Sequence, residues 1–247
     1  MAGASFFPRD PEYPIARLPH MQALGWIARV GSCIFMGMNG AAWVEFVAAS
    51  VALTVAPGPD NLFVLSQGII RGRKDALRTA WGMCSGNGVH TLAAAIGLSA
   101  LIRSSDWAFL ILRLAGAAYL LYLAWRTMRE MRSSGALAET IPVGTERPGK
   151  SRWFRRGLAM NVLNPKVILF FLAFLPQFAD PAAGPLALQL AILGLVFTAQ
   201  AFLIFSGIAW FAGAIGARLA QHPRYALRLR GISAAVFIAL AARLAWV

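Results

Sequence analysis

Long apolar runs, separated by short basic links, constrain the fold of this chain more than any other feature. A run of about 20 residues, wound as an α-helix at about 1.5 Å per residue, crosses the hydrocarbon core of a lipid bilayer. Six runs of this kind are present, at residues 41–67, 77–102, 107–125, 157–178, 186–213 and 229–247. The sequence therefore predicts an all-α membrane protein with six transmembrane helices.

The composition supports a membrane location. Of the 247 residues, 58% are hydrophobic and 13% are charged, whereas about a quarter of the residues of a soluble domain are charged. A soluble fold of this composition would aggregate. Only two cysteines occur, Cys33 and Cys84, and they form neither a disulfide framework nor a metal-ligand spacing. We therefore expect no cofactor and no metal.

The basic residues are concentrated in three links between the apolar runs. Sixteen of the 23 Lys and Arg residues lie in these links or within two residues of them: four at the link between the first and second runs, eight between the third and fourth, and four at the link between the fifth and sixth. Because successive spans cross the membrane in opposite directions, all three links lie on the same side of the membrane. The positive-inside rule assigns that side to the cytoplasm. Both termini are then periplasmic, and the two sets of three spans form inverted repeats. This placement explains the net charge of +13 without a nucleic-acid partner.

Two segments are expected to lie outside the helical bundle. Residues 1–37 contain four prolines, and Arg29 interrupts their weaker apolar stretch. An arginine near mid-span costs about 2.5–3.5 kcal/mol, so we expect a disordered or surface-lying extension to a six-helix domain at 38–247, unless Met38 is the true start. The hydrophilic stretch 126–156 has no sustained apolar period and is predicted to be a loop.

The first apolar run is interrupted by the sequence Pro57-Gly58-Pro59-Asp60-Asn61. Each proline removes a backbone donor and clashes with the carbonyl four residues earlier, so the helix breaks here, and hydrocarbon cannot satisfy the polar groups that are freed. Asp60 follows at the amino end of the resumed helix, where the helix dipole favours the ionised carboxylate. Either Asp60 only caps that helix, or it binds a substrate ammonium group or a coupling proton; its place inside a span favours the second interpretation. Asn61 belongs to the same candidate site, most simply as a donor to freed carbonyls.

The fourth run carries a second break, at Asn164-Pro165-Lys166, in the comparable place of the inverted half. Asn164 and Lys166 are both candidates for substrate binding or proton coupling. Interrupted helices at corresponding positions of two inverted repeats indicate the central site of a membrane carrier. Three interpretations of Lys166 remain open: its long side chain reaches the cytoplasmic headgroups, it pairs with Asp60, or it binds a substrate carboxylate. An ion pair is compatible with function, because substrate or proton binding would compete with it and bias two conformations.

The second run bears a stripe of small and polar residues, in which Gly82, Gly86 and His90 recur every four residues on one helix face. A wet histidine titrates in the physiological range, so His90 is a candidate for substrate binding or proton coupling; alternatively, it only hydrogen-bonds a neighbouring helix. Helices pack closely in lipid where side chains are small. We expect Gly82, Gly86, Gly97 and Gly116 to lie at helix contacts.

With these residues located, the chain from Met38 to Val247 resembles the LysE/RhtB family of bacterial amino-acid exporters. A single shared tripeptide would be weak support, but the order and spacing of the motifs together are specific. The motifs are Pro57-Gly58-Pro59-Asp60-Asn61, Ser66-Gln67-Gly68, Arg71-Gly72, Gly82, Ser85-Gly86, Val89-His90, Gly116-Ala117-Ala118-Tyr119-Leu120, Phe154-Arg155-Arg156-Gly157-Leu158, Asn161-Val162-Leu163-Asn164-Pro165-Lys166 and the stretch from Phe170 to Phe178.

The resemblance implies a six-helix carrier of the bacterial inner membrane that exports small neutral or basic amino acids, such as threonine, homoserine or lysine, by proton antiport. Such a protein is a transporter and not an enzyme. Its partners are an amino-acid substrate and the lipid bilayer, and it is compatible with assembly into a homo-oligomer. We expect Asp60 to take the amino group or the proton and Lys166 the carboxylate, while the two halves rock about them. An exporter of metal cations or of another small solute is the alternative. A membrane enzyme or redox conductor would need catalytic groups or a cysteine pair that the apolar runs lack.

Overall fold

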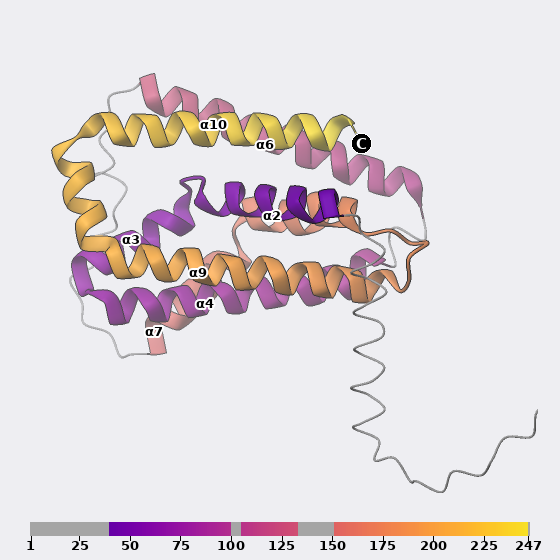
Figure 1. Cartoon of the computed structure of the whole chain (residues 1–247), viewed down its shortest axis with the longest axis horizontal. Helices are drawn as coiled ribbons and strands as arrows, with labels where there is room; N and C mark the ends of the chain where they lie inside the picture. Colours follow the sequence, from indigo (N-terminus) through magenta and orange to yellow (C-terminus); the bar gives the residue numbers. More distant parts are fainter. Residues whose placement is uncertain (1–39, 100–104, 133–150, 247) are drawn as a thin grey trace, which may run out of the picture.

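The computed structural model describes residues 40–99, 105–132 and 151–246. The predicted extension at residues 1–37 lies outside these described residues, so its expected form stays a prediction. Within the described ranges every regular element is helical (Figure 1). The all-α fold class is therefore confirmed for this part of the chain.

The elements follow one another as long helices, two of which are broken. The first broken helix consists of α2 (Gly40–Val55) and α3 (Pro59–Arg71). The second consists of α7 (Ser151–Val162), α8 (Pro165–Leu169), the π-helical turn η3 (Phe170–Phe174) and the 3-10 turn η4 (Leu175–Phe178). The unbroken helices are α4 (Arg73–Ala93), which continues as the π-helical turn η1 (Ala94–Leu98), α6 (Asp106–Arg132), α9 (Leu186–Gln221) and α10 (Pro223–Trp246).

Both breaks fall where the prolines predict them. α2 and α3 are bent by 55° relative to each other, and α7 is bent by 50° relative to the segment Pro165–Phe178. Pro59 is the first residue of α3 and Pro165 the first of α8. At the first position of a helix a missing N–H costs no helical hydrogen bond, and the fixed backbone angle of proline suits the new helix. Proline therefore ends one half-helix and begins the next.

The helices are apolar enough to cross a membrane at several places. Among the described residues, Trp107–Met131, Leu186–Leu219 and Arg224–Trp246 qualify by length and composition, and the two bent pairs raise the number to five. α4, at the expected second span, does not qualify, because its buried faces carry Gly, Asn, Thr and His residues. α4 still runs along α9 for much of the length of the bundle (Figure 1). Six spans in two inverted repeats therefore stay a prediction.

Helical structure extends beyond two of the predicted apolar runs. α6 and α7 continue into both ends of the predicted loop 126–156, where Arg126 pairs with Glu130 at 3.0 Å one helical turn away. The basic link between the last two runs is also helical on both sides of His222. The prediction of a loop was wrong at these ends, because charged residues end an apolar run without ending a helix.

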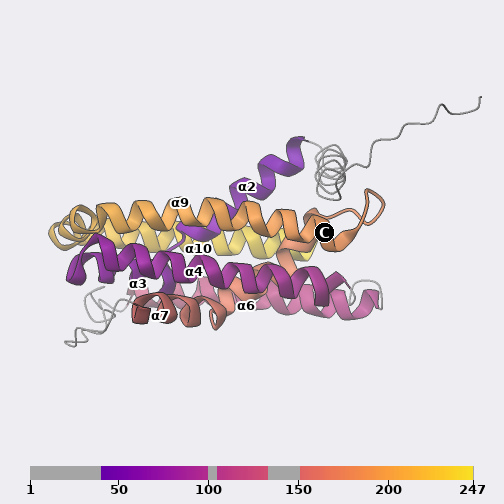
Figure 2. The same ribbon diagram turned by 90° about the horizontal axis from the view of Figure 1, so that it is seen from below.

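The helices form two outer groups, with α2 and η3 of the broken helices between them. α6 and α10 pack along each other on one side (Figure 1), and α4 lies between α9 and α7 on the other (Figure 2). α2 contacts both α9 and α10, η3 contacts α6, and α3 packs on α9 and α4. The two breaks consequently bring Asp60 and Lys166 into the buried middle of the bundle.

Small residues permit a close crossing of α4 and α7. A Cβ atom on Gly82 would overlap the carbonyl oxygen of Phe154, and one on Gly157 would overlap the carbonyl oxygen of Thr79. The two backbones therefore touch without an intervening side chain, which is the usual way in which helices associate in lipid.

The expected glycine contacts are confirmed in most cases. Gly86 faces the side chain of Asn161 on α7, and a Cβ atom on Gly116 would lie 2.8 Å from the Cβ atom of Ala173. The expectation was wrong for Gly97, because an added Cβ atom there would meet nothing within 4 Å among the described residues. A glycine in a predicted helix does not by itself indicate which face of that helix contacts a neighbouring helix.

Gly82→Leu should destabilise the bundle by forcing α4 away from α7. Overpacking a close contact costs about 1–3 kcal/mol, and more where backbone must move. We expect the thermal midpoint of the detergent-solubilised protein to fall by several degrees. Gly88→Leu, at a glycine of the same helix with open space around it, is the matched control. Equal midpoints for the two variants would show that the crossing does not depend on Gly82.

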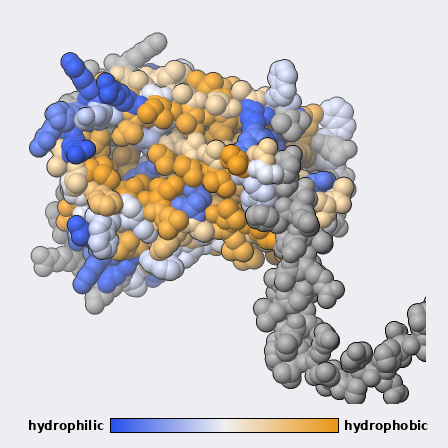
Figure 3. Space-filling view, in the orientation of Figure 1, coloured by the Kyte–Doolittle hydropathy of each residue, from blue (hydrophilic) through white to orange (hydrophobic). Residues whose placement is uncertain are grey.

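The basic links gather at one end of the molecule. The α3–α4 link, the α9–α10 link, the carboxyl end of α6 and the start of α7 all lie at the left in Figure 1. The start of α2, the α9 amino end and the last residues of α10 lie at the opposite end, which we call the distal end. Hydrophilic side chains cluster over the left end in Figure 3, whereas apolar side chains cover the middle. The expected gathering of positive charge on one side is thus present.

Candidate functional site

The first break exposes backbone carbonyls that side chains then satisfy. Pro57 and Pro59 have no N–H, so the carbonyl groups of Leu53 and Val55, four residues earlier, lose their helical donors. The side-chain amide of Asn61 donates to the carbonyl oxygen of Val55 at 3.1 Å, and it also reaches the preceding carbonyl at 2.8 Å. Asn61 therefore acts as the donor to freed carbonyls that the sequence suggested.

Lys166 reaches the same break from the second broken helix. Its Nζ atom donates to the carbonyl oxygen of Leu53 at 3.3 Å and to that of Ala56 at 3.4 Å. The same Nζ lies 3.1 Å from Oδ2 and 3.2 Å from Oδ1 of Asp60. The two side chains are only 4% and 3% exposed. Of the three interpretations of Lys166, the structure contains the ion pair, and it excludes a side chain that reaches the headgroups.

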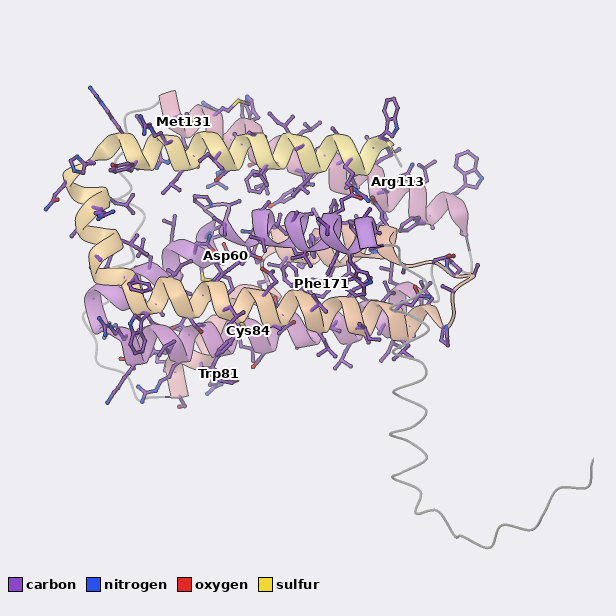
Figure 4. The ribbon with its side chains drawn as sticks, viewed as in Figure 1. Asp60, Trp81, Cys84, Arg113, Met131 and Phe171 are labelled. Atoms are coloured by element: carbon purple, nitrogen blue, oxygen red, sulfur yellow. The ribbon has the colours of Figure 1, made fainter. Side chains whose placement is uncertain are left out.

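Asp60 lies in the first turn of α3, as expected, and faces the interior of the bundle (Figure 4). Gly58 allows the ion pair to lie against the backbone. A Cβ atom on Gly58 would sit 2.7 Å from Oδ1 of Asp60 and 3.0 Å from Nζ of Lys166. A carboxylate, an ammonium group and two backbone carbonyls thus meet beside Gly58, which has no side chain to fill the space.

The second break is satisfied by a side chain from the other half of the protein. Pro165 has no N–H, so the carbonyl of Asn161 loses its helical donor. That carbonyl oxygen instead accepts from the backbone N–H of Asn164 at 3.0 Å and lies 3.2 Å from Nε2 of His90. A carbonyl oxygen can only accept, so Nε2 carries the proton in this contact. His90 therefore joins α4 to the second break.

Asn164 prepares the start of α8. Its side-chain oxygen accepts from the backbone N–H of Lys166 at 3.0 Å, which is the usual capping bond at a helix start. The backbone that carries Lys166 is thereby fixed relative to the break. Asn164 acts on the site through this cap in the structure, and a direct contact with substrate stays a prediction.

Further amide groups surround the two breaks. The amide of Asn161 donates to Asn87 at 3.0 Å, and that of Gln200 donates to the hydroxyl of Thr54 at 2.9 Å. Six buried amide atoms have no hydrogen-bond partner in the described part of the chain: Asn61 Oδ1, Gln67 Oε1, Asn87 Nδ2, Asn161 Oδ1, Asn164 Nδ2 and Gln200 Oε1. Buried amides usually find partners, so this polar shell has spare hydrogen-bonding capacity for a bound solute or for water.

Sequence reasoning missed a polar cluster at the distal end. Arg243 of α10 pairs with Glu45 of α2, and its Nη1 donates to the side-chain oxygen of Gln177 at 2.6 Å. Its guanidinium group also lies 4.4 Å from the ring centre of Phe178. The signal was present as two opposite charges inside the first and last apolar runs. Arg113 was missed as well: it projects from α6 near the distal end (Figure 4), and its Nε atom is buried without a hydrogen-bond partner among the described residues.

Comparison with known proteins identifies the family. The LysE type translocator model matches residues 51–246. The chain is 35% identical over 181 residues to an uncharacterized membrane protein of Pseudomonas aeruginosa, covering 67% of this chain and 81% of the relative. It is 31% identical to the homoserine/homoserine lactone efflux protein of Salmonella typhimurium, covering 82% and 95%. It is 32% identical to the leucine efflux protein of an Enterobacter species, covering 81% and 93%. No solved structure matches this chain.

The LysE type translocators are transporters and not enzymes, and apolar helices with two proline breaks fit a multi-pass membrane protein of this class. The chain belongs to the LysE family of translocators, as its motifs indicated, and is accordingly a multi-pass protein of the inner membrane.

Proposed function

We propose that this protein exports amino acids from the cytoplasm by alternating access, with the Asp60–Lys166 pair as its substrate site. One observation carries the proposal: a carboxylate and an ammonium group face each other, buried, between two broken helices. A zwitterionic amino acid offers the complementary pair of charges. The names of two relatives, a homoserine/homoserine lactone efflux protein and a leucine efflux protein, support the same class of substrate.

The surroundings of Lys166 Nζ support an ammonium site. Two backbone carbonyls and the Asp60 carboxylate surround this atom within 3.1 to 3.4 Å. The ammonium group of an amino acid has the same charge and the same three donors as the side chain of Lys166. A substrate therefore competes for these acceptors, and the displaced Lys166 becomes free to pair with the substrate carboxylate. Binding and release then shift the ion pair between two states.

The proposal also includes the orientation of the protein in the membrane and the coupling of export to protons. The basic end faces the cytoplasm and the distal end the periplasm, in keeping with the positive-inside rule, and six spans form two inverted repeats. Asp60 is the group that takes up the coupling proton, and one proton that enters for each amino acid that leaves makes the cycle a proton antiport. His90 is a further titratable group at the breaks and serves the transfer of this proton.

Efflux from loaded cells tests the proposed function. Cells with and without the gene are loaded with a panel of labelled amino acids, and the release of each is followed. We expect gene-dependent release of at least one amino acid, and its loss when the proton gradient is collapsed. Gene-dependent release of a metal cation or another small solute, with none of any amino acid, would favour the alternative exporter instead.

Gly58→Ala should reduce efflux without removing the protein from the membrane. The added methyl group would displace Asp60 and Lys166 by a fraction of an ångström to an ångström, and a misplacement of about 1 Å can cost about 100-fold in rate. We expect a loss of about tenfold or more in initial efflux at equal protein levels. Gly207→Ala, at a position with open space on α9, is the control. Equal rates for both variants would contradict a tight site at Gly58.

His90→Gln separates proton coupling from hydrogen bonding. Glutamine can still donate to the carbonyl oxygen of Asn161, but it does not titrate. We expect normal protein levels and retained exchange of labelled for unlabelled amino acid, which needs no net proton movement, together with loss of efflux driven by a proton gradient. If proton-driven efflux were undiminished, His90 would have no part in proton transfer and would only donate its hydrogen bond to α7.

A further inference from the structure

We infer that the transported amino acid carries an aliphatic side chain, which enters an apolar cavity beside the ion pair. The inference rests on the proposed function and adds the class of side chain to it. The cavity has a volume of about 10 Å³ and lies between the two broken helices and the α6–α10 pair. Leu53, Gly116, Leu120, Leu169, Phe170, Phe174, Leu240 and Leu244 line it.

The cavity begins one helical turn from the proposed ammonium and carboxylate positions. Leu53 lines it with its side chain, while its carbonyl oxygen accepts from Lys166 Nζ. Leu169 and Phe170 follow Lys166 by three and four residues, so the three share one helix face. An amino acid whose charged groups replace the ion pair therefore has its Cα atom next to this cavity.

The walls offer nothing polar to a bound side chain. Every lining residue has a hydrocarbon or aromatic side chain, or none, and Leu53, Phe170 and Leu244 are at most 3% exposed. A hydroxyl group placed here would lose its hydrogen bonds with water, and an ammonium group would lose more. Because of that penalty, efflux of homoserine or threonine should be about tenfold or more slower than efflux of an aliphatic amino acid. The ammonium and carboxylate groups of the substrate bind at the Asp60–Lys166 site, so the cavity discriminates between amino acids by their side chains alone.

A substrate side chain larger than a methyl group requires the far wall of the cavity to move outward. Its present volume accommodates about one water-sized group. Leu120 comes from α6 and Leu240 from α10, and these two helices pack mainly on each other, while α10 touches α2 and α9 and α6 touches η3 more lightly. A Cβ atom on Gly116 would lie 2.8 Å from Ala173 and 3.0 Å from Leu244, so this glycine brings α6 close and sets the floor of the cavity. The α6–α10 wall thus limits how long a side chain fits.

Relative efflux from cells loaded with equal amounts of competing amino acids tests the inference. The probes are alanine, valine and leucine, then homoserine and threonine, then lysine. We expect the aliphatic set to leave about tenfold faster than the hydroxyl set, and lysine to leave slowest. Preferential release of homoserine, threonine or lysine would overturn the aliphatic cavity while leaving amino-acid export intact. Release of no amino acid would refute the proposed function itself.

Two variants locate the selectivity in the cavity. Leu240→Ala enlarges it and should raise the ratio of leucine to alanine efflux by about tenfold, the usual scale for one or two carbon atoms in an apolar pocket. Ile238→Ala, on the same helix but 43% exposed toward lipid, is the matched control and should leave the ratio unchanged. Leu120→Ser, which adds a hydroxyl partner, should raise homoserine relative to valine. Ratios are independent of protein level, so a less stable variant still gives a result; unchanged ratios in both cavity variants would overturn the inference.

Discussion

Replacing Asp60 with asparagine will abolish amino-acid efflux while the protein remains in the membrane. Asparagine has nearly the same shape but no charge, so the site loses its partner for the substrate ammonium group and its proton acceptor. The Lys166 ammonium then lies buried without a carboxylate, which in other proteins costs about 3–5 kcal/mol. Initial efflux of a transported amino acid, normalised to the amount of protein in the membrane fraction, measures the loss. We expect at least about a 100-fold decrease.

Asp75→Asn is the matched control for this substitution. Asp75 lies in the first turn of α4 and pairs with Arg78 where both side chains are partly exposed, 25% and 35%. An exposed pair of this kind contributes about 0–1 kcal/mol, so efflux should stay close to that of the unaltered protein. Normal efflux by the Asp60 variant would remove this residue from the transport mechanism.

A neutral replacement of the whole ion pair will restore stability but not transport. Lys166→Met alone leaves a buried carboxylate and should destabilise the protein by about 3–5 kcal/mol. Adding Asp60→Leu removes the second charge, and well-packed apolar pairs are often as stable as the ion pairs that they replace. The double variant should therefore recover most of the thermal midpoint lost in the single variant. Efflux should be absent in both.

The combination of the two readouts separates a structural pair from a functional one. Thermal midpoints in detergent follow the stability, and efflux per molecule follows the function. If the double variant regained efflux together with its stability, the Asp60–Lys166 pair would only hold the two broken helices together.

The helix breaks were predictable because their cause is local. Proline lacks a donor wherever it stands, so Pro57, Pro59 and Pro165 break their helices regardless of the surroundings. The identity of the groups that satisfy the freed carbonyls was only partly predictable. Asn61 is close in sequence to the carbonyls that it reaches. His90 is 71 residues away from its acceptor, and only the fold brings them together.

The ion pair at the centre of the site required the three-dimensional structure. Asp60 and Lys166 are 106 residues apart, and the sequence left headgroup contact, pairing and substrate binding open for Lys166. The distal pair of Glu45 and Arg243 is separated by 198 residues and was not predicted at all. Both pairs join opposite charges inside apolar runs, so the sequence marks these charges as candidates for pairing, but only the fold shows which of them meet.

The grouping of the helices also went beyond the sequence. Hydropathy places spans along the chain, but it does not say which spans are neighbours. α6 and α10, at the third and sixth expected spans, pack along each other, although they belong to different halves of the predicted repeat. α4 was predicted as a span by its length, yet its polar buried faces keep its apolarity below that of the other helices. Those faces serve contacts with α7 and α9 and not with lipid.

Competition in proteoliposomes tests the central claim most directly, that the Asp60–Lys166 site recognises both charged ends of an amino acid. Exchange of a labelled transported amino acid is measured against the same unlabelled amino acid, its N-acetyl derivative and its amide. The intact zwitterion should compete, and each derivative, which lacks one charge, should compete at least about 100-fold less well. Equal competition by the N-acetyl derivative or the amide would contradict the claim.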